Sequence, residues 1–401
     1  MTGQNTRLEG PIAVRMADVD NGLSQHFDCS GYKLALVFFR QKGSIIGREI
    51  FSVINGCLPT DQVLSAAREM EAEPTAGDIW RPELRPAPRM GSTAVTVAVC
   101  TRNRASLLRT CLESLIAIDW NPLEIIVIDN CPADDSTKNV VGQFRGVGYA
   151  MHKQPGLNRA RNAAISLARG EIIAFTDDDA RVDRNWLKGS IPNFADPMVA
   201  LVTGITLPAE LETEAQIDFE MGTSFIRGFQ RRQFTIKNAN PLKVAEMGAG
   251  ANMAIRVSLL GEIGSFDERL DGGTPTRSGG DHDFFSRALA SGYRIVYDPS
   301  AIAWHYHKRT RDEVATTMRG YGVGFFAWWT KALIERKEFS VILMAPLVLL
   351  NHHMKRVIES LFARNGTLRF RYCWAELRGA LRGPLAYFHS RLITGKKCQS
   401  T

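Results

Sequence analysis

Short apolar runs alternate with amphipathic segments between residues 95 and 175. The runs VTVAVC (95–100), LEIIVI (123–128) and EIIAF (171–175) have the character of buried strands, and residues 104–118 repeat Leu and Ile at helical spacing. Further helices are expected over 134–144 and 158–169, and a short strand over 148–152. This alternation predicts an α/β fold in which helices cover both faces of a mostly parallel central sheet.

The regions on either side of this pattern differ from it. Residues 1–30 show no clear period and are expected to form an arm without regular structure. Two β-rich runs (32–40 and 45–54), a turn at 41–44 and a helix over 59–70 predict a small ββα appendage within residues 1–73. This appendage carries no cluster of acids, histidines or nucleophiles, so a structural or docking role is expected. We therefore expect, in chain order, the appendage 1–73, a proline-rich linker 74–93, the main domain 94–310 and a helical tail 311–401.

The tail is basic and partly apolar. Residues 301–401 hold 17 Lys and Arg against 6 Asp and Glu, a formal +11 against +7 for the whole chain, so residues 1–300 are net acidic. The apolar run 339–350 has 12 residues and contains Pro346, whereas a membrane span needs ~20 apolar residues, so it is expected not to cross a bilayer. Peripheral contact with an anionic membrane, packing on the main domain and a homodimer contact stay open. Nucleic acid is not expected as a partner, because no nucleic-acid-binding motif accompanies the charge.

Composition narrows the class of protein further. Apolar residues make up 45% and charged residues 23%, as in globular proteins, which excludes a disordered or fibrous chain. The seven cysteines form no C-x-x-C pairs, so neither a disulfide framework nor a zinc site is indicated. The first ten residues lack a basic-then-apolar signal pattern. The predicted location is the cytoplasm, with the inner face of the plasma membrane as the alternative.

Polar side chains follow three of the predicted strands at the edge where such sheets bind ligands. Thr101 to Arg104 follow the first strand, Asp129 and Asn130 the second, and Asp177 to Asp179 the strand 171–175. Three consecutive carboxylates repel one another unless a positive group lies among them, and Mg²⁺ and Mn²⁺ prefer oxygen ligands. The alternative is a solvated acidic loop. Neither G-x-G-x-x-G nor a P-loop motif is present to hold phosphate instead.

An ordered set of segments resembles family 2 glycosyltransferases with the GT-A fold. The resemblance covers residues 95–310 and implies transfer of a sugar from a nucleoside diphosphate sugar, with Mg²⁺ or Mn²⁺ on the diphosphate. The segments that carry it are VTVAVCTRNR (95–104), EIIVIDN (124–130), PGLNRARNAAI (155–165), EIIAFTDDDA (171–180), GAGANMAI (248–255), GSFDERL (264–270), GGDHDFFSRAL (279–289) and YDPSAIAWHYH (297–307).

The resemblance also implies site residues. Asp179 would be a metal ligand, with Asp178 as a spacer, and His305 would complete the coordination, with His307 as its competitor on the same side of a strand. The alternative for Arg161 is a surface arginine paired with Glu171. The residues implied to bind the nucleotide sugar are Thr101, Asn103, Arg104, Asp129, Arg161 and Asp177.

Asp281 resembles the acid that deprotonates the acceptor hydroxyl in inverting members of the family. A carboxylate ionised at working pH and within reach of the hydroxyl suits this role. The alternative is a helix cap, since Gly-Gly-Asp before an apolar run is also a cap signature. Gly280 departs from the family, which usually has Glu there. Residues 248–253 are expected to form a small-residue strand under the sugar, and the glycine-rich segment 272–280 a lid.

The predicted function is therefore an inverting, metal-dependent glycosyltransferase that acts on a carbohydrate or lipid-linked acceptor hydroxyl in polysaccharide, cell-envelope or glycolipid synthesis. A non-catalytic carbohydrate- or membrane-binding scaffold with the same fold is the alternative from another class, and Gly280 favours it. A nucleotidyltransferase is disfavoured, because residues 101–108 lack a glycine-rich run with a following lysine.

Overall fold

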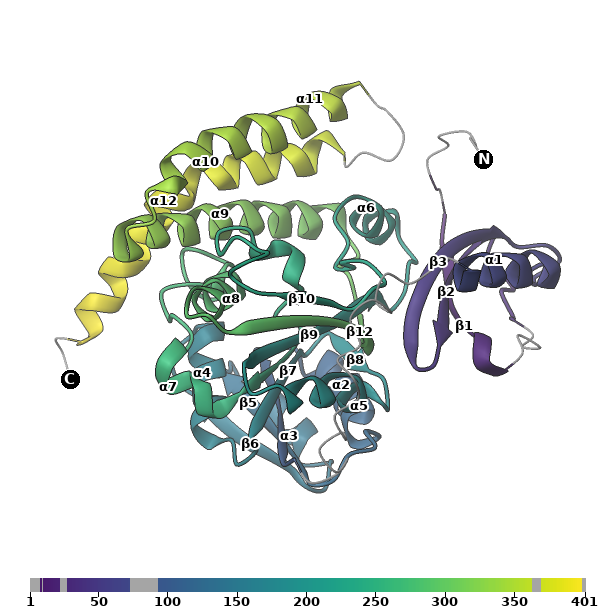
Figure 1. The fold of residues 1–401 in the computed structure, drawn as a ribbon, viewed down its shortest axis with the longest axis horizontal. Coiled ribbons are helices and arrows are strands. Elements are labelled where there is room, and N and C mark those ends of the chain that lie inside the picture. Colours follow the sequence, from purple (N-terminus) through teal and green to yellow (C-terminus); the bar gives the residue numbers. More distant parts are fainter. Residues whose placement is uncertain (1–7, 9, 22–26, 73–92, 363–368, 399–401) are drawn as a thin grey trace.

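The structure is a computed structural model, and it describes residues 8, 10–21, 27–72, 93–362 and 369–398. An N-terminal unit, a large central domain and a set of long helices follow one another along the chain (Figure 1). The predicted linker 74–93 lies almost wholly outside the described residues. The domain boundaries therefore stay predictions.

The N-terminal unit is a three-stranded sheet with one helix on it. Its elements are β1 (Ile12–Asp18), β2 (Leu34–Gln41), β3 (Ser44–Ser52) and α1 (Thr60–Ala72). The predicted hairpin is confirmed, since β2 and β3 pair antiparallel and Gln41 lies opposite Ser44. The expectation of an irregular arm over 1–30 is wrong for residues 12–18, which form β1 and pair parallel with β2. Parallel pairing with a later strand leaves no turn signal in the sequence to reveal it.

The central domain is built on one mixed sheet with the order β10-β12-β9-β11-β7-β4-β5-β6, and β8 pairs β12. The pairs β12–β9, β7–β4, β4–β5 and β5–β6 are parallel, whereas β11 is antiparallel to both of its neighbours. The strands are β4 (Val95–Thr101), β5 (Leu123–Asn130), β6 (Val147–His152), β7 (Ile172–Asp177), β8 (Ala180–Val182), β9 (Val199–Pro208), β10 (Arg232–Phe234), β11 (Asn252–Arg256) and β12 (Arg294–His305).

Helices cover both faces of this sheet, as the sequence predicts. Successive residues of a strand point to opposite faces, so Ile173 and Phe175 of β7 join one buried apolar cluster while Ile172 and Ala174 join the other. The helices of the domain are α2 (Ala105–Ile116), α3 (Ser136–Val141), α4 (Leu157–Leu167), α5 (Trp186–Ser190), α6 (Glu214–Gly222), α7 (Leu260–Ile263) and α8 (Gly280–Ala290).

Long helices form the C-terminal part. The helix α9 (Arg311–Arg336) packs along α12 (Phe370–Cys398), and α10 (Ser340–Val348), a π-helical turn (Leu349–Met354) and α11 (Lys355–Leu361) lie alongside them in Figure 1. A capping box of Thr310 and Glu313 starts α9. The expectation that the apolar run 339–350 is too short to span a membrane is wrong. The helix continues to Leu361, and Ser340–Leu361 is long and apolar enough to span a membrane by length and composition.

Candidate active site

Strand pairing brings the acidic turn after β7 to the end of β12. The strand β8, which begins at Ala180, pairs antiparallel with β12 and places Ala180 opposite His305. The backbone N–H of Tyr306 donates to the Asp179 carbonyl at 2.8 Å. These backbone contacts fix His305 beside Asp179, although 126 positions separate them in the chain.

Asp179 lies among three basic groups. Its carboxylate is 3.1 Å from His305 Nε2, 2.9 Å from Lys308 Nζ and 3.1 Å from Arg104 Nη1, and the residue is buried. Burial alone would raise the pKa of Asp179, but the neighbouring His305, Lys308 and Arg104 charges hold it far below its usual range. Asp179 is therefore ionised at any working pH.

The other two acids of the triplet differ from Asp179. Asp178 accepts from the Thr101 hydroxyl at 2.7 Å and from Arg104 at 3.0 Å. Its carboxylate therefore connects the end of β4 to the turn between β7 and β8. Burial, and then the charge of Asp179, raise the pKa of Asp177 to about 6. Asp178, expected to be a spacer, thus has fixed partners of its own.

Asp177, Asp179 and His305 form a group of donors with the chemistry of a divalent cation site. One ligand atom from each lies within 4.8 Å of the others. Carboxylate oxygens suit Mg²⁺ and Mn²⁺, and an imidazole nitrogen is accepted by the softer Mn²⁺. The residue types present therefore fit such an ion, which would have to take an Asp179 oxygen that Lys308, Arg104 or His305 contacts in this structure. His307 points elsewhere, since its Nε2 lies 3.2 Å from Glu220.

The residues expected in the nucleoside pocket line the same edge of the sheet. Asn103, which has a left-handed backbone (φ 55°), accepts from the Ala133 N–H at 2.9 Å and so joins the ends of β4 and β5. Asp129 is fully buried and accepts from the Tyr149 hydroxyl at 3.0 Å. Tyr149 occupies only Oδ2, whereas Oδ1 is buried without a hydrogen-bond partner among the described residues, so Oδ1 is the atom left to accept from a further donor.

Arg161 is a buried arginine and not the surface residue of the alternative interpretation. Its guanidinium donates to Asp271 at 3.0 Å and to Asn158 at 3.1 Å, and it lies over the Phe266 ring with 5.3 Å to the centroid. Although burial opposes it, the charges of Asp271, and after it those of Asp177 and Asp281, raise the pKa of Arg161. Arg161 thus links the acidic turn to the start of α8.

Asp281 lies in the first turn of α8, and both of its oxygens accept backbone N–H bonds. Oδ2 accepts from Gly250 at 3.0 Å and Oδ1 from His282 at 2.8 Å. Burial would raise the pKa of Asp281, but the charges of His282 and Arg161 and these two donors lower it. The N-cap position is Gly279, so Asp281 does not act as the cap considered in the sequence.

Gly280 is enclosed by polar side chains. A Cβ at this position would lie 2.4 Å from Asn158 Nδ2 and 2.5 Å from Asp271 Oδ2. The carboxylate of Asp271 therefore lies against the position where the resemblance implies Glu, and it pairs with Arg161. The segment 272–280 leads on from Asp271, which is held further by the Thr276 hydroxyl accepting from the Asp271 N–H at 3.0 Å.

The small-residue strand expected over 248–253 is shorter than predicted. The strand β11 begins only at Asn252, and residues 248–251 form the turn before it. This turn supplies the Gly250 N–H that Asp281 accepts. The glycines therefore serve a backbone contact with α8 and not a longer strand.

Sequence reasoning missed a buried chain of polar groups behind His305. His305 Nδ1 lies 3.2 Å from His307 Nδ1, His307 Nε2 lies 3.2 Å from Glu220, and Glu220 pairs with Arg48 of β3. Glu220 is fully buried and lies on α6. No local signal marks this chain, because Arg48, Glu220 and His307 are far apart in the sequence.

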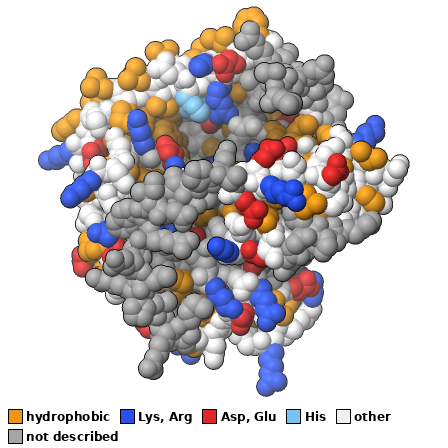
Figure 2. Space-filling view, turned by 45° about the vertical axis from the view of Figure 1, so that its right-hand side comes forward, with side chains coloured by type: hydrophobic (Ala, Val, Ile, Leu, Met, Phe, Trp, Pro, Cys, Tyr) orange, Lys and Arg blue, Asp and Glu red, His pale blue; other side chains and the backbone are white. Residues whose placement is uncertain are grey.

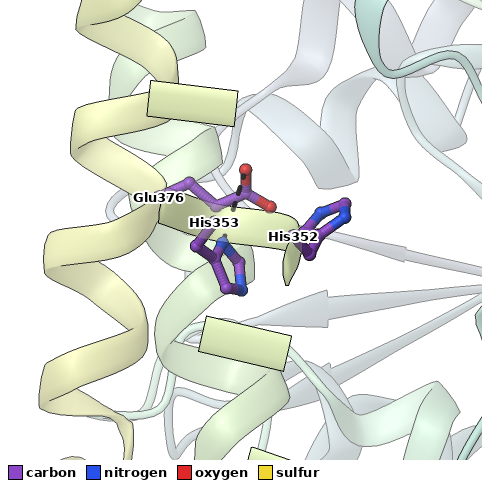
Figure 3. Close-up of side chains that lie close together, drawn as sticks. All are labelled: His352, His353 and Glu376. Carbon is purple, nitrogen blue, oxygen red and sulfur yellow. Dashed lines mark ion pairs between the residues drawn. The ribbon is translucent and has the colours of Figure 1, made fainter. Parts of the chain in front are cut away.

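A second cluster of metal-binding residue types, His352, His353 and Glu376, lies between the π-helical turn and α12 (Figure 3). Arg356 Nη1 is 3.0 Å from Glu376 and 3.2 Å from His352. A guanidinium therefore already contacts two of the three donors. Burial, followed by the charges of His352 and Arg356, lowers the pKa of His353 to about 4. We attribute this cluster to packing of α12 against the π-helical turn.

The order of the strands and the polar edge of the sheet agree with the GT-A-like fold that the motifs indicate. Residues 96–264 match the family model described as glycosyl transferase family 2. The match lies within the central domain and agrees with the family that the motifs indicate and with the glycosyltransferase class.

Curated relatives agree with this class. The chain is similar to a pre-mycofactocin glycosyltransferase of Mycobacterium tuberculosis (29% identity, 55% of this chain, 44% of the relative) and to the glycosyltransferase AglE of Haloferax volcanii (23%, 53% and 66%). It is also similar to the succinoglycan biosynthesis protein ExoO of Rhizobium meliloti (26%, 54% and 61%). The matched part spans about half of these relatives. Among solved structures, the mannosyltransferase PcManGT of Pyrobaculum calidifontis in complex with GDP-Man and Mn²⁺ aligns with a TM-score of 0.48 at 18% identity over 80% of both chains.

Proposed function

We propose that this protein is an inverting, metal-dependent glycosyltransferase that moves a sugar from a nucleoside diphosphate sugar to an acceptor hydroxyl. The observation that carries the proposal is the group Asp177, Asp179 and His305 at the sheet edge, with Arg161 linking it electrostatically to Asp281. A metal-binding group and an ionised carboxylate that share one neighbour are the two components that such a reaction needs.

Each residue has a role in this proposal. Asp179 and His305 hold Mg²⁺ or Mn²⁺, while Asp177, whose carboxylate lies within 4.8 Å of their ligand atoms, contacts the ribose. Thr101, Asn103, Arg104, Asp129 and Arg161 form the surroundings of the nucleotide. When bound, the divalent ion supplies a Lewis acid that neutralises negative charge on the departing diphosphate. Arg161, held by Asp271, adds a fixed positive charge at the same edge.

Asp281 is the general base of the proposal. Its pKa is lowered, so the carboxylate is ionised near neutral pH and can accept the acceptor hydroxyl proton. The hydroxyl oxygen then forms a bond to the anomeric carbon while the bond to the diphosphate oxygen breaks. A single displacement of this kind inverts the configuration at that carbon.

The acceptor, location and assembly belong to the proposal as well. We propose a carbohydrate or lipid-linked acceptor in polysaccharide, cell-envelope or glycolipid synthesis, and a cytoplasmic protein that contacts the inner face of the plasma membrane. A homodimer through the tail is the alternative use of the same helices. The exposed apolar side chains of α10–α12 support a surface contact of either kind.

A thermal-shift screen of nucleotide sugars tests the donor. One or more nucleoside diphosphate sugars should raise the unfolding temperature with Mn²⁺ present and fail to do so with a chelator, because binding to the folded state stabilises it. Release of the nucleoside diphosphate from that sugar should then be detectable. A donor that stabilises the protein equally without any divalent ion would contradict the metal role.

The alternative hypothesis of a non-catalytic scaffold is based on the absence of a carboxylate at Gly280. Asp271 lies against that position and pairs with Arg161, which weakens the argument for a scaffold. Binding of a nucleotide sugar without turnover, in the presence of a broad set of acceptors, would restore it.

A further inference from the structure

Four arginines from three separate segments meet beside the entry to α8. Arg277 lies in the segment before Asp281, Arg319 on α9, and Arg378 and Arg382 one turn apart on α12. Within the described residues, no hydrogen bond or ion pair is found for any of the four guanidinium groups. We call these four residues the arginine cluster.

Close backbone packing forces the cluster together. A Cβ at Gly379 would lie 2.2 Å from the Arg319 carbonyl oxygen, so α12 crosses α9 directly at Arg319, with Arg378 and Arg382 on either side of the crossing. On another side of α9, the Ser278 hydroxyl donates to the Gly320 carbonyl at 2.9 Å, and this brings Arg277 against the same turn of the helix.

The cluster gathers four like charges, of which Arg277, Arg378 and Arg382 are exposed and Arg319 is partly buried. The Nε of Arg319 is buried and has no partner. Burial, and then the charges of Arg382, Arg277 and Arg378, lower the pKa of Arg319. Arg356 of the tail, by contrast, forms an ion pair with Glu376. A group of like charges with an unpartnered buried donor indicates a site for an anionic group.

The surface next to the cluster is apolar. Leu381 and Leu385 are 61% and 72% exposed, and they follow Arg378 by three and seven positions, which places them on its face of α12. Most of the exposed large hydrophobic side chains among the described residues lie between 339 and 393. Figure 2 shows such side chains, in orange, along the upper edge of the molecule where α10 and α11 lie, with Lys and Arg in blue beside them.

We propose that the arginine cluster binds the phosphate groups of anionic phospholipids while the exposed leucines of α12 lie in the outer part of the acyl layer. Guanidinium groups match phosphate oxygens in geometry and charge, and the adjoining apolar face suits a lipid better than a soluble phosphate compound. The helices would lie on the membrane and not cross it, because Arg356 ties the Ser340–Leu361 helix to Glu376 of α12. This inference rests on the membrane contact of the proposed function and names its site, but it does not depend on the transfer reaction.

Vesicle co-sedimentation of the full chain tests this site. Vesicles of phosphatidylcholine with phosphatidylglycerol should bind the protein, and phosphatidylcholine alone should bind it weakly. The double variant Arg378→Gln/Arg382→Gln should bind the anionic vesicles ~30-fold more weakly, since each basic residue near such a surface contributes about one factor of five. The matched control is Arg68→Gln/Arg145→Gln, which removes the same charge from exposed positions elsewhere and should change binding little.

Further measurements decide between sources of the anion. Calorimetry with inorganic phosphate should detect no tight binding to the wild-type chain, and Leu381→Ser/Leu385→Ser should weaken vesicle binding while the arginines are intact. Equal vesicle binding by the two double arginine variants would overturn the proposal. So would tight binding of free phosphate without vesicle binding, or a stable dimer that does not bind vesicles. The thermal shift with donor and Mn²⁺ reports separately on the proposed function, so the two failures are distinguishable.

Discussion

At the scale of single residues, Asp271 explains how the site tolerates Gly280. The carboxylate of Asp271 lies 3.0 Å from Arg161 and occupies the space beside the glycine. A carboxylate supplied from the preceding turn therefore lies where the first turn of α8 lacks one. The glycine suits this arrangement, because any side chain at position 280 would have to displace the ends of Asp271 and Asn158.

Gly280→Ala is predicted to damage the site. The new Cβ would come within 2.4–2.5 Å of Asn158 and Asp271, so both side chains must shift and the contact with Arg161 weakens. Overpacking of this kind typically costs ~1–3 kcal/mol of unfolding free energy, and transfer should fall with it. Denaturant unfolding and a transfer assay measure the two effects.

Gly261→Ala on α7 is the matched control, since a Cβ there meets nothing within 4 Å. It should leave transfer unchanged and should not lower the unfolding free energy, because Gly→Ala at an open helical position is neutral to stabilising. Identical unfolding midpoints for Gly280→Ala and Gly261→Ala would contradict this account of the packing around position 280.

At the scale of elements, a buried ion-pair cluster fastens α9 to the central domain. Lys331 of α9 lies 2.7 Å from Asp283 of α8 and 2.8 Å from Asp267, and all three side chains are buried. Arg269 also pairs with Asp267 at 2.6 Å. Burial would raise the pKa of Asp267, but Arg269 and Lys331 hold it well below the usual range.

Lys331→Met is predicted to destabilise the protein by roughly 3 kcal/mol, near the lower end for a broken buried ion pair, because Arg269 and Arg287 still contact the carboxylates. A carboxyl group with a lowered folded-state pKa contributes stability above its unfolded pKa of ~4 and loses it as the pH falls. The difference between variant and wild type should therefore shrink below about pH 4. Urea unfolding at several pH values measures it.

The control is Lys355→Met, which removes an exposed lysine 3.8 Å from Glu359 and should cost less than 1 kcal/mol. A difference for Lys331→Met that stays constant down to pH 3 would argue against the role given to Asp267.

The elements that the sequence revealed are those with strong local patterns. Apolar strands such as β4 and β7 and periodic helices such as α2 and α4 lie within a few residues of their predicted positions. The strand β1 alternates less clearly and depends on pairing with β2, so it was missed. The same holds for the site. Asp177 and Asp179 could be predicted because they follow an apolar strand directly in the sequence, whereas the contact of Arg161 with Asp271 joins residues about 110 positions apart.

At the scale of the whole molecule, the N-terminal unit contacts the buried polar residues that lie behind His305 of the candidate metal site. Arg48 of β3 pairs with the buried Glu220, Glu220 contacts His307, and His307 lies beside His305. Carboxylate–histidine contacts behind a metal ligand fix the orientation of its ring. The appendage, for which the sequence suggested a structural role, is thus connected to the candidate site through this series of side-chain contacts.

Arg48→Gln is predicted to weaken Mn²⁺-dependent donor binding by about tenfold, since outer partners of metal ligands contribute at this scale. Glu220 would lose its cationic partner, and the His307 and His305 rings would be held less firmly. Titration calorimetry with the donor measures the change, and Arg68→Gln, an exposed arginine of α1, is the control. Equal donor affinity in both variants would show that the appendage does not position the site.

The most direct test of the account is donor binding by two variants of the candidate active site. Calorimetry with the stabilising nucleotide sugar and Mn²⁺ should show no metal-dependent binding to Asp179→Ala. Asp281→Asn should bind the donor nearly as tightly as wild type but transfer no sugar. Undiminished, Mn²⁺-dependent binding by Asp179→Ala, or transfer at the wild-type rate by Asp281→Asn, would contradict the roles given to these two carboxylates.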